Sequence, residues 1–257
     1  MAGASPHDIV IEACVNSVGS AIEAEKGGAG RVELCDNLYE GGTTPSAGAI
    51  QSARACLAIE LNVMIRPRGG DFHYSDLELE IMKADLLVAK GLGADGVVFG
   101  ILHTDGTIDV ERSRELVELA RPMSTTFHRA FDMTADPCAA LEDLVRVGVD
   151  RVLTSGQRPS AMAGIELLAR LVERAGDRIV VMPGVGIDAS CIAELAAGTG
   201  AVEFHVLAQK SVQSSMVFRN DEVFMGSTPD LPEYEVFLTD ADRIRAICTA
   251  VSTRESG

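Results

Sequence analysis

The sequence alternates between two kinds of segment along most of its length, and this alternation constrains the fold more than any other feature. Helix-like stretches alternate with short strand-like runs, and several of the stretches end at glycine, as a helix C-terminus prefers. Alternating strands and helices form parallel sheets, and eight units in about 200 residues favour an α/β fold of the TIM (β/α)8 barrel type. The strand-like runs are IVIEACV (9–15), RVELC (31–35), LNVMIRP (61–67), ADGVVFG (94–100), STTFHR (124–129), DRVLTSG (150–156), RIVVMPG (178–184) and AVEFHVL (201–207).

The main alternative is a doubly wound open sheet, but no GxGxxG motif follows the first strand-like run. No linker or shift of composition divides the chain, so we predict a single domain over residues 1–257. We expect the barrel at about residues 8–210 and a C-terminal extension at about 211–257. The extension is predicted to contain an irregular tail and a final helix at about Asp240–Ser252.

The alternation within each strand predicts which side chains point into the barrel. Helices cover the outer face of a barrel and require apolar neighbours, so the polar face of each strand should point inward. The outward residues are then Val63, Ile65, Phe127, Val202, Phe204 and Val206. The inward residues are Glu12, Cys14, Arg31, Glu33, Cys35, Met64, Arg66, Arg68, Thr126, His128, Glu203 and His205.

Such an interior is unusually ionisable, because barrel interiors are mostly filled by Val, Ile and Leu. These groups could neutralise one another as an internal salt-bridge network. Strands 8, 1, 2 and 3 are neighbours around a barrel, however, so their polar residues would line one side of one pocket, which favours a site with shifted pKa values. The candidates for a general acid or base are Glu12, Glu33, His128 and His205.

A second set of residues predicts an anion-binding site. Arginines at a pocket rim bind carboxylate or phosphate, and glycines before a helix N-terminus free backbone N–H groups for the same purpose. The MPGVGI segment (182–187) has such glycines, ahead of a helix expected to begin near Asp188, although a tight turn is an equal alternative. The candidate residues are Arg31, Arg66, Arg68, Gly184 and Gly186.

Two of the six cysteines occupy the predicted interior. Cys14 and Cys35 end neighbouring strands, so their thiols could face each other, and paired thiolates suit Cu(I). The alternative is that both are small packing residues. The other four cysteines fall on helix-like stretches, and the absence of CxxC spacing gives no signal for a disulfide framework or a structural zinc site.

Charge and hydropathy exclude several partners. The formal net charge of −16 repels nucleic acid and anionic membrane surfaces. The first residues have no signal-peptide pattern, and no apolar run approaches the ~20 residues of a membrane helix. We therefore expect a cytoplasmic protein that binds neither nucleic acid nor membrane.

Several longer motifs resemble the CutC family of copper homeostasis proteins. They are EACVNSV, GGAGRVELCDNLYEGGTTPS, VMIRPRGGDFHYSDLE, ADGVVFG, TFHRAFDM, RVLTSG, IVVMPGVGI, EFH and MVFRN, in this order. The resemblance implies a cytoplasmic TIM-type barrel, often a homo-oligomer. The sequence itself gives no evident sign of an organic cofactor. Family-wide residues match Glu12, Cys14, Arg31, Glu33, Cys35, Arg66, Arg68, His128 and His205.

Two functions follow from these observations. In relatives, Cu(I) binding has been attributed to cysteines that match Cys14 and Cys35, so the resemblance implies a copper homeostasis protein with Cu(I) as its ligand. The ionisable interior favours instead an enzyme that acts on a small anionic metabolite, a phosphate or a carboxylate.

Overall fold

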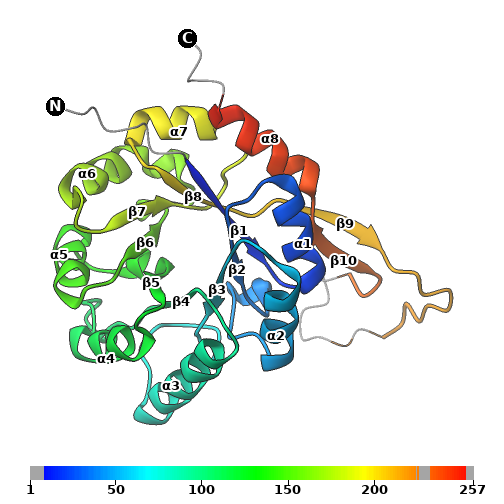
Figure 1. Cartoon of the computed structure of the whole chain (residues 1–257), viewed down its shortest axis with the longest axis horizontal. Coiled ribbons are helices and arrows are strands. Elements are labelled where there is room, and N and C mark those ends of the chain that lie inside the picture. Colours follow the sequence, from blue (N-terminus) through cyan, green and yellow to red (C-terminus); the bar gives the residue numbers. More distant parts are fainter. Residues whose placement is uncertain (1–8, 224, 226–231, 253–257) are drawn as a thin grey trace.

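The computed structural model describes residues 9–223, 225 and 232–252, and over these the chain folds as the predicted barrel (Figure 1). The parallel sheet has the strand order β7-β6-β5-β4-β3-β2-β1-β8. A parallel bridge between Gly184 and His205 joins its two edges and closes the barrel. The strands are β1 (Val10–Val15), β2 (Arg31–Leu34), β3 (Glu60–Met64), β4 (Gly96–Phe99), β5 (Ser124–Phe127), β6 (Arg151–Thr154), β7 (Val180–Pro183) and β8 (Glu203–Val206).

Each of the strands β1 to β7 is followed by a helix on the outside of the barrel, as Figure 1 shows, and a last helix follows β8 after two further strands. The start of α3 follows from its sequence, because Ser75 and Glu78 form a capping box that satisfies free N–H groups of the first turn. The helix at Ala47–Cys56 contains four alanines among its ten residues, and it ends at Cys56, which was expected on a helix-like stretch. The helices are α1 (Val18–Gly27), α2 (Ala47–Cys56), α3 (Asp76–Gly91), α4 (Val110–Ala120), α5 (Pro137–Val147), α6 (Ile165–Ala175), α7 (Ile192–Thr199) and α8 (Ala241–Ser252).

The C-terminal extension differs in part from the expected irregular tail. Its first and last segments pair as an antiparallel hairpin of β9 (Gln209–Gln213) and β10 (Glu235–Thr239), which projects beside the barrel (Figure 1). Residues 224 and 226–231 of the tail lie outside the described residues. The expected final helix is present as α8, which packs between α7 and α1 and completes the helical ring.

The core between strands and helices confirms the predicted phase. Among the residues expected to face outward, Val63, Ile65, Phe127 and Phe204 are fully buried there, because the helices remove that face from water. Val202 is the exception: it precedes β8 and is 37% exposed, so it does not pack under the helices.

None of the helices within the described ranges is long and apolar enough to cross a membrane.

Candidate functional site

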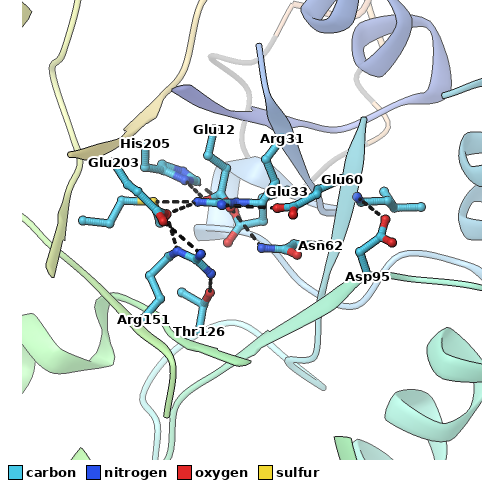
Figure 2. Close-up of polar contacts among 12 residues, drawn as sticks. Glu12, Arg31, Glu33, Glu60, Asn62, Asp95, Thr126, Arg151, Glu203 and His205 are labelled. Atoms are coloured by element: carbon cyan, nitrogen blue, oxygen red, sulfur yellow. Dashed lines mark hydrogen bonds and ion pairs between the residues drawn. The ribbon is translucent and has the colours of Figure 1, made fainter. Parts of the chain in front are cut away.

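A network of charged side chains crosses the barrel interior, centred on Arg31 (Figure 2). Its Nε donates to the Glu12 carboxylate at 2.5 Å, and its Nη2 donates to Glu203 at 2.5 Å. Arg151 of β6 pairs with the same Glu203, and Glu60 approaches Arg31 Nη1 at 3.4 Å. Arg31 and Arg151 therefore neutralise Glu12 and Glu203 at this level, which is part of the salt-bridge network given above as the alternative.

The network fixes the charges of its members. Burial acts to raise the pKa of Glu12, but its hydrogen bond with His205 and the positive charge of Arg31 hold that pKa well below its ordinary value. Burial likewise opposes the ionised form of Glu203, and Arg151 lowers its pKa all the same. Because Nε, Nη1 and Nη2 of Arg31 all have protein partners, this guanidinium is held by the barrel itself.

A second cluster lies beside this network, around His205. His205 Nδ1 lies 2.8 Å from Glu12 Oε1, and its Nε2 lies 3.8 Å from Glu33 Oε2. Cys35 Sγ lies 3.3 Å from the same Glu33 oxygen. Cys14 offers its Sγ to this cluster, since ligand atoms of Cys14, Glu33 and Cys35 lie within 4.8 Å of one another.

The two thiols differ in protonation. The hydrogen bond from Cys35 lowers the pKa of Cys14 to about 5, against the effect of burial and with help from His205. The same hydrogen bond, together with burial, raises the pKa of Cys35 well above its ordinary value. At neutral pH the pair therefore holds one thiolate, on Cys14, and one thiol, on Cys35.

His205 and Glu33 complete the charge balance. Burial raises the pKa of Glu33 to about 8, so its carboxyl group is mostly protonated at pH 7. Burial disfavours a charged imidazole, but the acidic side chains of Glu33, Cys14 and Glu12 outweigh it and hold the pKa of His205 well above its ordinary value. The Glu12 carboxylate and the Cys14 thiolate favour the protonated ring in addition to Glu33.

The positions of Cys14 and Cys35 in the sequence suggested that they lie directly opposite each other on β1 and β2. In the structure they do not. The β1–β2 register pairs Cys14 with Glu33, so Cys35 lies diagonally across from Cys14. The thiols are nevertheless neighbours in one small buried cluster, which also contains Met64 and Val98 and is covered by Leu38. The arrangement brings two sulfur atoms together at the C-terminal ends of β1 and β2.

Arg66 and Arg68 lie apart from this cluster, in the segment after β3. Arg66 is buried and donates to the carbonyls of Glu40, Gly42 and Gly70, which leaves only its Nε without a partner among the described residues. Arg68 does not point into the interior, contrary to the predicted phase: it stacks on Tyr74, and its Nε donates to Glu78. The strand ends at Met64, so the alternation no longer applies four residues later.

His128 follows β5 and is buried against Phe72, which also stacks on Arg66. Burial, together with the charge of Arg66, lowers the pKa of His128 to about 3. Its Nδ1 accepts from Ala130 N, so the proton of the neutral ring is on Nε2, which has no partner among the described residues.

Part of the glycine segment after β7 helps to close the barrel. Gly184 forms the bridge with His205, and Val185 and Gly186 both have positive φ, 78° and 69°. The following helix begins at Ile192 rather than near Asp188, so its N-terminus is separated from the glycines by a turn. The anion-binding role of Gly184 and Gly186 stays a prediction.

Sequence reasoning missed several residues that complete the site. Asn62 donates to Glu12, Arg151 pairs with Glu203, and Leu38 covers the thiols. Extending the period-two phase backward from Met64 would have placed Asn62 and Glu60 inside, and the same rule applies to Arg151 at the start of β6. Leu38 lies on a 3-10 turn, Leu38–Glu40, and no periodicity signals its position.

Comparison with known proteins identifies relatives over nearly the whole chain. A model of the CutC family matches residues 9–210. A Mus musculus protein named copper homeostasis protein cutC homolog is 52% identical over 238 residues, which are 93% of this chain and 88% of the mouse protein. Its Homo sapiens counterpart is 51% identical over 246 residues, which are 96% of this chain and 90% of the human protein.

Solved structures agree. The crystal structure of a putative copper homeostasis protein CutC from Streptococcus agalactiae is 38% identical, with a TM-score of 0.74 over 77% of this chain and 97% of that chain. Phosphoribosylanthranilate isomerase from Thermotoga maritima is 14% identical, with a TM-score of 0.55 over 95% of this chain and 99% of that chain, and it shares the fold alone.

Proposed function

Because this chain belongs to the CutC family, whose relatives in mouse and human are named copper homeostasis proteins, we propose that it binds one Cu(I) ion through the Sγ atoms of Cys14 and Cys35. The observation that carries the proposal is the pairing of two buried thiols, one of them a thiolate, beside the His205 imidazolium.

The chemistry of the donors suits Cu(I). Soft thiolate ligands select this ion, and the buried cluster around the sulfurs shields it from water and from oxidation. Two thiolates with one cuprous ion carry a net charge of −1, and the neighbouring His205 imidazolium compensates it. The barrel interior therefore accommodates the complex without an unpaired buried charge.

A second group of potential ligands, Glu12, Glu33 and His205, lies next to the thiols and shares Glu33 with them. Its donors are harder, and they suit other metals better than Cu(I). An imidazolium has protons on both nitrogens and offers no lone pair to a metal. We therefore assign these three side chains to the support of the thiolates rather than to the metal itself.

The proposal predicts cuprous uptake that depends on the two thiols. Under anaerobic conditions, the purified protein should bind about one Cu(I) per chain in competition with a chromogenic Cu(I) chelator. The Cys14→Ser, Cys35→Ser variant should lose this binding, because a hydroxyl is a poor ligand for a soft metal. A Cys56→Ser, Cys138→Ser variant serves as the control, since both residues lie on outer helices and should leave uptake unchanged. Equal uptake by the two double variants would refute the proposal.

The same proposal includes the cellular compartment and the oligomeric state of the protein. Free thiols persist in the reducing cytosol, so we place the protein there, with the copper ion as its partner and without nucleic acid or membrane. The six cysteines are all unpaired, which is compatible with that compartment. A homo-oligomer, implied by the family resemblance, remains part of this proposal.

A second candidate function rests on two other buried groups. Arg66 Nε and His128 Nε2–H are buried donors without partners among the described residues, and both side chains contact Phe72. A buried donor without a protein partner is usually satisfied by water, an ion or a ligand. A carboxylate or phosphate oxygen would satisfy them, as an enzyme for a small anionic metabolite requires.

A further inference from the structure

We propose that the thioether of Met64 supplies a third sulfur ligand to Cu(I) at the Cys14–Cys35 pair. The inference rests on the proposed function and extends it from two donors to three. The three residues would come from three consecutive strands, β1, β2 and β3, at their C-terminal ends.

Met64 lies in the same buried cluster as the thiol pair. It is the last residue of β3, it is 4% exposed, and it belongs to the same buried cluster as Cys14 and Cys35. Gly42 locates it further: a β-carbon on this glycine would lie 3.2 Å from Cys35 Sγ and 3.5 Å from the terminal methyl of Met64. The two sulfur-bearing side chains therefore converge on one point under the loop that contains Gly42.

The loop that contains Gly42 leaves space beside the side chains of Cys35 and Met64. Gly42 has φ 90°, a conformation that favours glycine, and its missing side chain leaves Cys35 and Met64 uncrowded. A methionine side chain has three rotatable bonds, so its sulfur can turn toward a metal without movement of the backbone. Leu38 covers the same cluster from the loop and keeps it apolar.

The chemistry favours a thioether in this position. A thioether is a soft ligand for Cu(I), and it is neutral, so it adds a donor without adding charge. Two thiolates with one cuprous ion carry a net charge of −1, which a methionine ligand leaves unchanged, whereas a third thiolate would make it −2.

The chain offers a matched control in Met182. This methionine also points into the barrel and is fully buried, but it lies on β7, and its Sδ accepts from Arg31 Nη2 at 3.5 Å. It therefore belongs to the charged network rather than to the thiol cluster. Methionine and leucine have similar volumes, so Met64→Leu and Met182→Leu should both fold.

The test is competition for Cu(I) with a chromogenic chelator under anaerobic conditions, together with X-ray absorption spectroscopy at the copper edge. Met64→Leu should weaken Cu(I) binding by on the order of tenfold or more. It should also lower the sulfur coordination number from three to two, while Met182→Leu matches the unsubstituted protein in both measurements.

The outcomes separate the two proposals. If the unsubstituted protein binds Cu(I) with two sulfur ligands and Met64→Leu binds as tightly as Met182→Leu, the third-ligand inference is wrong and the cysteine site stands. If the unsubstituted protein does not bind Cu(I), both proposals are wrong. A thermal unfolding curve for each variant checks that the fold is retained.

Discussion

At the scale of single residues, the interior of this barrel shows how neighbours decide the charge of a buried group. Glu12 and Glu33 are both buried glutamates, yet the pKa of Glu12 is held low and that of Glu33 is raised to about 8. The difference is the hydrogen bond of Glu12 with His205 and the charge of Arg31, whose guanidinium contacts Glu12 and not Glu33. The pKa values of Cys14 and Cys35 also move in opposite directions, because Cys35 donates a hydrogen bond and Cys14 accepts it.

His128 gives a prediction about pH. Its pKa is lowered from 6.5 to about 3, so between these values the unfolded chain binds a proton that the folded chain does not. The stability that the neutral ring contributes is present above pH 6.5 and is lost as the pH falls toward 3. Between pH 6.5 and 5.5 the unsubstituted protein should lose about 1 kcal/mol more of its free energy of unfolding than His128→Asn does.

Urea unfolding of both proteins at the two pH values measures this difference. NMR provides a second check, since the ring protons of His128 should not shift between pH 5 and 8. An equal loss of stability in the two proteins, or a titrating His128 signal near pH 6, would show that the ring is not desolvated as described.

At the scale of elements, the packing of neighbouring strands depends on the size of the side chains that point into the barrel. Gly96 of β4 lies between the inward side chains of Asn62 on β3 and Ser124 on β5. A β-carbon on Gly96 would overlap with Asn62 Oδ1 and Ser124 Oγ. This glycine is therefore required by packing, and its φ plays no part.

We predict that Gly96→Ala lowers the free energy of unfolding by about 1 to 3 kcal/mol, because overpacking forces neighbouring side chains or strands to move. Gly91→Ala is the control: this residue ends α3, and nothing lies within 4 Å of the position of its β-carbon. Chemical denaturation measures both variants. A Gly96→Ala protein as stable as Gly91→Ala would mean that the interior at β4 has spare room.

At the scale of the whole molecule, the barrel and the polar interior could be predicted from the sequence, because both depend on periodicity. Glu12, Arg31 and Glu33 alternate with apolar neighbours that the helices must cover. The rule fails where a strand ends, and Arg68 is misplaced for that reason.

Other features depend on contacts between distant segments and have no local signal. The two strands of the hairpin, β9 and β10, are separated by more than 20 residues of the chain. The position of α8 in the helical ring depends on its packing on α1. The choice between a salt-bridge network and a site also required the structure, since the interior contains both: carboxylate–guanidinium pairs around Arg31, and a thiolate beside an imidazolium around His205.

The most direct test of the central claim is a crystal structure of the protein loaded anaerobically with Cu(I), with inorganic phosphate present, and with an anomalous difference map recorded at the copper edge. The account predicts one strong anomalous peak within bonding distance of Cys14 Sγ and Cys35 Sγ. An ordered anion beside Arg66 and His128, with no anomalous peak at the two thiols, would contradict it and favour the enzyme.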